Sequence, residues 1–206
     1  MRELSLHILD ILQNSVEAGA TRVELIIDED LAADRLTITI GDNGRGIPSE
    51  KLPNLFDPFY TTRSTRHVGL GLPLLKAAAE RCNGDVTLAS QVGVGATLTA
   101  TFQHSHLDRA PLGDLTGTLL TFILGGACDL RYVHRVRVAE VDKETRRQGD
   151  GSGGAGKQGS GRREREFEFD TVEIQSELGE VPLTHPDVRE WLKQFIAEGE
   201  AELSRE

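Results

Sequence analysis

The segment from Arg35 to Ile47 constrains the fold of this chain more than any other stretch. Apolar and polar residues alternate over residues 35–40, which is typical of a half-buried strand. A glycine-rich turn follows at once, Gly41-Asp42-Asn43-Gly44-Arg45-Gly46-Ile47, and glycines allow backbone conformations and close approaches that a Cβ would prevent. We therefore predict a strand end that presents Asp42. This carboxylate either belongs to an ordinary Asp-Asn-Gly turn or accepts a hydrogen bond from an amine such as that of adenine.

A helix and a first strand are predicted before this segment. Apolar residues recur at helical spacing between residues 4 and 16, and polar residues occupy the other side of the same helix. The polar side consists of His7, Asp10, Asn14 and Glu17. It is either an ordinary solvated face or, if Asn14 faces a ligand, part of a site. Residues 21–28 alternate as a strand, and residues 28–34 form a polar turn into the next one.

Residues 48–102 are predicted to form a short helical piece, a lid, a helix and a hairpin. The segment 57–67 is rich in hydroxyl groups, contains Arg63 and Arg66 and has no periodicity, so we expect a mobile lid. Gly69-Leu70-Gly71-Leu72-Pro73 then leads into a helix over 74–81. Free backbone N–H groups at such a helix start can hold an anion. Strands are expected at 86–90 and 96–102, joined by a glycine-rich turn.

The second half of the chain, residues 106–206, is predicted to form a small αββα module. We expect a helix at 112–124, strands at 130–141 and 166–174, and a final helix that begins near Pro186 and buries Val188, Trp191, Leu192, Phe195 and Ile196. A Gly/Ser-rich segment at 146–163 is too polar to pack and is predicted to be a flexible loop. His104 and His106 are a metal pair, a phosphoacceptor, or ordinary surface or interdomain residues.

Composition excludes several classes of function. The net charge of -10 argues against broad nucleic-acid binding, which requires a basic face. No segment reaches the roughly 18 consecutive apolar residues of a membrane span, and the N-terminus does not look like a signal peptide. Cys82 and Cys128 match no metal spacing and are expected to be buried free thiols. We expect a cytoplasmic protein that binds neither nucleic acid nor membrane.

Four segments of residues 1–103, in this order, resemble the GHKL superfamily, the ATP-binding fold of sensor histidine kinases, gyrase B, MutL and the anti-sigma kinases. They are the helix with Asp10 and Asn14, the turn from Asp42 to Gly46, residues 56–60 with Gly69-Leu70-Gly71-Leu72, and Gly93-Val94-Gly95-Ala96-Thr97. The resemblance implies an α+β fold of the Bergerat type over residues 1–105. This fold is an α/β sandwich whose mixed sheet carries helices on one face.

The resemblance also implies roles for individual residues. Asn14 would be an oxygen ligand of Mg²⁺, and Asp42 would bind the adenine amine. Gly44 and Gly46 would let the base approach, and Thr97 would assist near Asp42. The phosphates would be held by Gly69, Leu70, Gly71 and Leu72, with Thr62, Arg63 and Arg66 closing over them. Asp10 would be the general base or would act one step away from the nucleotide, since ATP-hydrolysing members usually carry a glutamate there.

The function implied is that of an Mg²⁺-ATP-binding protein, an ATPase or a kinase that acts on a separate protein partner or phosphoacceptor, alone or as a homodimer. The alternatives are a nucleotide-sensing module without turnover and an interaction protein without a ligand. Glu17 stands where many histidine kinases have a cation. We expect no phosphoacceptor hairpin before the ATP-binding half and no large transducer domain after it, so the chain resembles neither a complete sensor kinase nor a gyrase-type enzyme.

Overall fold

The computed structural model describes residues 2–57, 71–139 and 162–205. They form one six-stranded sheet in the order β3-β4-β2-β1-β5-β6. β1 and β5 are parallel, and every other neighbouring pair is antiparallel. The strands are β1 (Arg22–Asp30), β2 (Arg35–Asp42), β3 (Val86–Gln91), β4 (Gly95–Gln103), β5 (Asp129–Ala139) and β6 (Arg162–Asp170).

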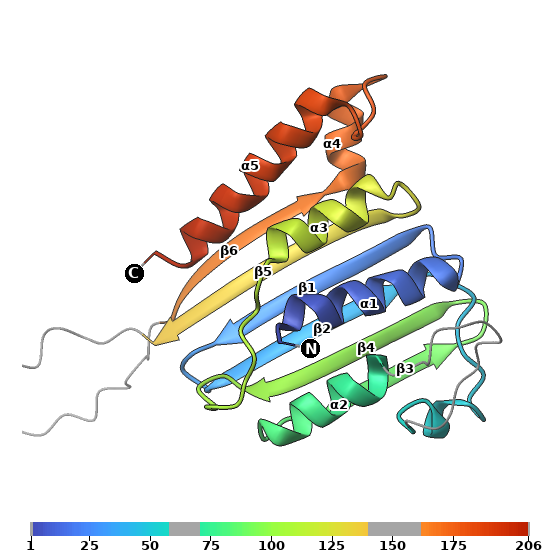
Figure 1. The fold of residues 1–206 in the computed structure, drawn as a ribbon, viewed down its shortest axis with the longest axis vertical. Coiled ribbons are helices and arrows are strands. Elements are labelled where there is room, and N and C mark those ends of the chain that lie inside the picture. Colours follow the sequence, from blue (N-terminus) through green and yellow to red (C-terminus); the bar gives the residue numbers. More distant parts are fainter. Residues whose placement is uncertain (1, 58–70, 140–161, 206) are drawn as a thin grey trace, which may run out of the picture.

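The helices pack against one face of this sheet. α1, α2 and α3 lie across the same face (Figure 1), and α5 packs beside them against α3, β5 and β6. The helices are α1 (Leu4–Glu17), the short 3-10 helix η1 (Leu52–Asn54), α2 (Gly71–Arg81), α3 (Leu115–Leu124), α4 (Thr171–Leu178) and α5 (Pro186–Leu203). The expected α/β sandwich, a mixed sheet with helices on one face, is confirmed.

Alternation along the strands produces the core. In β1 the side chains of Val23, Leu25 and Ile27 are fully buried while their neighbours are not, because successive residues of a strand point to opposite faces. The same alternation in β2 buries Leu36, Ile38 and Ile40. The apolar stripe of α1 packs into the same core. His7 lies on the same side of α1 as Asp10 and Asn14 but is only 5% exposed, so the expectation of a solvated face was wrong at this position.

The second half of the chain contributes to the same sheet. β5 pairs with β1, and β6 pairs with β5. The strands of both halves therefore form one continuous sheet. The division into domains at residue 105 stays a prediction. Most of the expected flexible loop 146–163 lies outside the described residues, but its last two residues, Arg162 and Arg163, belong to β6.

Two expectations for the C-terminal elements were wrong. The strand predicted to continue to Ile174 ends at Asp170, where the carboxylate of Asp170 accepts a hydrogen bond from the backbone N–H of Val172 and caps α4. Trp191 is 48% exposed and stacks on Phe195 with ring centroids 5.2 Å apart. The remaining stripe of α5 is buried or half-buried as expected. No helix in the described ranges is long and apolar enough to cross a bilayer.

A buried charged cluster attaches α5 to the sheet. The His134 side chain on β5 lies between two carboxylates, 2.9 Å from Glu200 of α5 and 3.1 Å from Glu29 of β1. Glu200 also accepts a hydrogen bond from the Tyr132 hydroxyl at 2.7 Å, and Glu29 contacts His104 at 2.7 Å. Burial alone would lower the pKa of His134, but its two carboxylate partners outweigh burial and raise that pKa to about 9.

This cluster predicts a pH dependence of stability. Because the pKa of His134 is higher in the folded state, its contribution is fully present below about pH 6.5 and is lost as the pH rises toward 9. Glu200→Gln should therefore reduce the free energy of unfolding by about 1–2 kcal/mol at pH 6 and by much less above pH 9. Urea denaturation of the wild type and the variant between about pH 6 and pH 9.5 measures this difference in unfolding free energy. Glu198→Gln, at an exposed position of α5, is the control, and an equal loss at pH 6 and pH 9.5 would contradict the assignment.

Candidate functional site

Asp42 is held at the end of β2 by two hydrogen bonds. One carboxylate oxygen accepts from the backbone N–H of Gly44 at 2.9 Å, and the other accepts from the Ser15 hydroxyl of α1 at 3.0 Å. Both contacts fix the orientation of the carboxylate. Each carboxylate oxygen has a further lone pair, so Asp42 can still accept a hydrogen bond from a ligand amine.

Ser15 was not singled out from the sequence. It is 3% exposed and lies on the buried side of α1, four residues after Ile11 and seven after Ile8. The available signal was a polar residue on an otherwise apolar stripe. Because buried hydroxyls are nearly always hydrogen-bonded, a serine at this position indicates that Ser15 has a polar partner. The sequence does not indicate which residue that partner is.

The packing of the turn itself requires glycine at position 46 and leaves little room for a side chain at position 44. Gly46 has a φ of +68°, and a Cβ there would lie 2.1 Å from the carbonyl oxygen of Gln91. A Cβ at Gly44 would lie 3.0 Å from Ala18. The turn thus packs between the end of α1 and the β3–β4 hairpin, and it is pinned by the hydrogen bonds Arg45 N–H to Ala18 O (3.0 Å) and Gly93 N–H to Arg45 O (2.9 Å). Approach of a base to Gly44 and Gly46 stays a prediction.

Thr97 lies next to the Asp42 strand end but on the other face. In the β2–β4 register Ala96 pairs with Asp42, and Thr97 pairs with Gly41. Paired residues point to the same side of a sheet and successive residues to opposite sides. The Thr97 hydroxyl is accordingly 3.5 Å from where a Cβ of Gly41 would be. The structure therefore does not bring the side chains of Thr97 and Asp42 onto one face.

The other end of the candidate site joins α1 to the start of α2. Asp10 and Asn14 are one helical turn apart on α1, so they face the same way. A Cβ at Gly71 would lie 1.7 Å from an Asp10 carboxylate oxygen. The two residues are therefore in contact, and a side chain at position 71 would require the Asp10 carboxylate to move. Leu72 packs at the margin of the core.

Five predicted site residues cannot be placed. Thr62, Arg63, Arg66, Gly69 and Leu70 lie outside the described residues. Among the residues that can be placed, Asp10 and Asn14, the predicted general base and Mg²⁺ ligand, lie on α1. Asp42, the predicted adenine contact, lies at the adjoining end of β2. The oxygen donors of Asp10 and Asn14 are of the hard type that Mg²⁺ prefers.

The two histidines after β4 have ordinary contacts. His104 pairs with Glu29 of β1 at 2.7 Å, and His106 Nδ1 accepts a hydrogen bond from the backbone N–H of Asp108 at 3.2 Å. Within the described part of the chain, no cluster of three or more His, Cys, Asp or Glu side chains is arranged to hold a metal ion. These contacts favour ordinary structural roles over a metal pair, and the contact of His104 lies within the predicted first domain.

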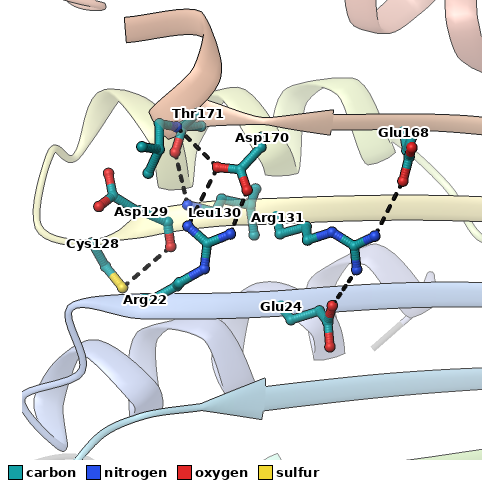
Figure 2. Close-up of polar contacts among 10 residues, drawn as sticks. Arg22, Glu24, Cys128, Asp129, Leu130, Arg131, Glu168, Asp170 and Thr171 are labelled. Atoms are coloured by element: carbon teal, nitrogen blue, oxygen red, sulfur yellow. Dashed lines mark hydrogen bonds and ion pairs between the residues drawn. The ribbon is translucent and has the colours of Figure 1, made fainter. Parts of the chain in front are cut away.

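A cavity of about 350 Å³ lies where β1 and β5 begin. Around it, Figure 2 shows Arg22 paired with Asp170, and Thr171 accepting a hydrogen bond from the backbone N–H of Leu130 at 2.9 Å. Burial raises the pKa of the neighbouring Cys128 thiol to about 11, so at neutral pH it is a protonated thiol and a poor nucleophile. These polar groups are largely satisfied within the protein.

Similarity to known proteins is found over the first half of this chain. A sequence profile described as histidine kinase-, DNA gyrase B-, and HSP90-like ATPase matches residues 2–106. The signal transduction histidine-protein kinase AtoS of Escherichia coli is 39% identical over 93 residues, covering 45% of this chain and 15% of AtoS. The sensor protein BceS of Halalkalibacterium halodurans is 33% identical over 103 residues, covering 48% of this chain and 30% of BceS.

One more sensor kinase and one solved structure are also similar to this chain. The autoinducer 2 sensor kinase/phosphatase LuxQ of Vibrio parahaemolyticus is 33% identical over 117 residues, 51% of this chain and 14% of LuxQ. These relatives are therefore matched over less than a third of their own length. A solved N-terminal domain of a DNA repair protein covers 65% of this chain and 49% of its own, with 16% identity and a TM-score of 0.46. The match over residues 2–106 places this chain in the family of histidine kinase-, DNA gyrase B- and HSP90-like ATPases.

Proposed function

We propose that this protein binds Mg²⁺-ATP and either hydrolyses it or transfers its γ-phosphoryl group to a separate protein partner. The observation that carries the proposal is the anchored carboxylate of Asp42, held by Ser15 and Gly44 at the strand end. An acceptor fixed in this way suits the exocyclic amine of adenine. It lies next to the α1 helix that carries Asn14 and Asp10.

The triphosphate end of ATP would lie along α1 toward the start of α2. Asn14 would hold Mg²⁺, which neutralises charge that develops on the phosphates. Asp10 would orient the attacking water or hydroxyl group and accept its proton. We assign docking of the partner, or of a second copy of the chain, to the C-terminal half, since β5 and β6 extend the sheet beyond the candidate site and α5 packs against them.

A second candidate is a nucleotide sensor without turnover. The contact between Asp10 and Gly71 favours it, because Asp10 is already engaged at the start of α2. An aspartate is also shorter than the glutamate that ATP-hydrolysing relatives usually carry at this position. In this case ATP would change a binding surface and remain intact.

Incubation with γ-labelled ATP and Mg²⁺ separates these functions. We expect released phosphate or a labelled protein partner; binding without either would support the sensor. Asn14→Ala should remove the Mg²⁺ dependence of nucleotide binding, because its amide oxygen is the predicted metal ligand. Gln13→Ala, an exposed amide on the same helix, is the control. Absence of nucleotide binding by the wild type would exclude both functions, and an Mg²⁺ dependence that survives in Asn14→Ala would refute the role of Asn14.

A further inference from the structure

His7 of α1 contains an unusual buried atom. The residue is 5% exposed, and its Nδ1 is a buried side-chain atom without a hydrogen-bond partner among the described residues. Burial of a polar atom without a hydrogen bond is unfavourable. Such atoms are rare in native proteins, and a role in catalysis is one of the few explanations for them.

The position of His7 connects this atom to the candidate site. His7 is three residues before Asp10 and seven before Asn14, so all three lie on one side of α1. Side chains of a helix lean toward its N-terminus, so the Asp10 carboxylate extends over the turn that carries His7. Asp10 contacts Gly71, which means that this side of α1 faces the start of α2.

The charge state of His7 suits a hydrogen bond to a carboxylate. Burial lowers the pKa of His7, so the imidazole is neutral at physiological pH. A neutral imidazole has one N–H donor and one acceptor nitrogen, and the tautomer follows the hydrogen bond available. With the proton on Nδ1, His7 can donate to a carboxylate oxygen or to a water bound to it.

We propose that His7 is a positioning residue for Asp10. When nucleotide is bound, its Nδ1–H donates a hydrogen bond to the Asp10 carboxylate, directly or through one water, and fixes the orientation of that carboxylate. The inference rests on the proposed function, because Asp10 has a reacting group to serve only if ATP is turned over. A histidine that merely fills space would have no such effect on Asp10.

Three substitutions of His7 separate positioning from packing. Leu has a similar volume and no polar atom, Asn places an amide near the position of Nδ1, and Gln places it near Nε2. His7→Leu should raise the urea midpoint of unfolding, because it removes the unpaired nitrogen. The same substitution should lower kcat about 10- to 100-fold, as loss of a supporting hydrogen bond does. It should also change the pH profile of kcat. His7→Asn should restore most of kcat and His7→Gln should not. Gln13→Ala should leave kcat unchanged.

A second measurement does not depend on turnover. In protein saturated with Mg²⁺ and a non-hydrolysable ATP analogue, the ¹⁵N resonance of His7 Nδ1 should shift when Asp10 is replaced by Asn. An unchanged resonance, or a kcat pH profile that is the same in wild type and His7→Leu, would overturn the inference while leaving the proposed function intact. A shifted resonance in a protein that binds ATP without turning it over would show the contact between His7 and Asp10 but would refute turnover, and with it the positioning role. Absence of nucleotide binding by the wild type would refute both.

Discussion

Asp42→Ala is expected to weaken ATP binding by about 10- to 100-fold, which is the size of a lost hydrogen bond to a charged acceptor. The carboxylate accepts from Ser15 at 3.0 Å and from Gly44 at 2.9 Å, so it is oriented before the ligand arrives. Preorganisation of this kind adds to affinity, because no side-chain freedom is lost on binding. Titration calorimetry with ATP measures the change.

Nucleotide selectivity provides the sharper measurement. Adenine presents an amine where guanine presents a carbonyl oxygen, so a carboxylate that only accepts should favour ATP over GTP. Asp42→Asn introduces an amide that can also donate and should narrow the ratio of the two affinities. Ser15→Ala should produce a smaller loss of ATP affinity, since it removes only the orienting hydrogen bond.

The control for Asp42 is Asp108→Ala, which removes an exposed carboxylate with the same charge. Thermal melts of each variant show whether affinity is lost through unfolding. If Asp42→Ala binds ATP as tightly as the wild type, or if Asp42→Asn keeps the wild-type preference for ATP over GTP, then the adenine contact lies elsewhere.

Gly46→Ala is expected to destabilise the fold by about 3 kcal/mol or more. Gly46 has a φ of +68°, a conformation that costs a residue with a Cβ roughly 1–2 kcal/mol. The new Cβ would also lie 2.1 Å from the Gln91 carbonyl oxygen and 3.0 Å from Val92 Cα. These are backbone atoms that cannot move aside as a side chain does, so an overpacking cost of about 1–3 kcal/mol is added.

Gly93, in the β3–β4 hairpin against which Gly46 packs, offers a matched control. Its φ is +77°, but a Cβ there would meet nothing within 4 Å, so Gly93→Ala isolates the backbone cost of about 1–2 kcal/mol. Urea denaturation of both variants gives the difference. Equal losses in Gly46→Ala and Gly93→Ala would mean that the turn does not pack against Gln91 as described. A much larger loss of unfolding free energy in Gly46→Ala than in Gly93→Ala would show that the turn needs Gly46 whether or not a base approaches it.

Local patterns predicted the elements nearest the site well. The stripe of α1, the alternation of β1 and β2 and the glycine turn each depend on residues close in sequence, and all three form as expected. The strand predicted through Ile174 fails for a local reason as well. Thr171, Val172 and Ile174 are β-branched and favour a strand, but the Asp170 cap begins a helix at this point.

The contacts that complete the site depend on long-range packing. The hydroxyl of Ser15 meets Asp42 across 27 residues of sequence, and nothing in the spacing of α1 specified that partner. The parallel pairing of β5 with β1 likewise joins residues more than 100 positions apart. Periodicity shows which face of an element is buried, whereas the choice of neighbour depends on how all the faces fit together.

The sequence alone determined that a strand would end at Asp42 in a turn requiring glycine, and that Asp10 and Asn14 would share one side of a helix. These are consequences of backbone geometry over a few residues. Only the tertiary structure decided that Ser15 orients Asp42, that Gly71 contacts Asp10 and that His7 is buried with its Nδ1 unpaired. The reason is that burial and hydrogen-bond partners are set by close packing between elements, which no local pattern encodes.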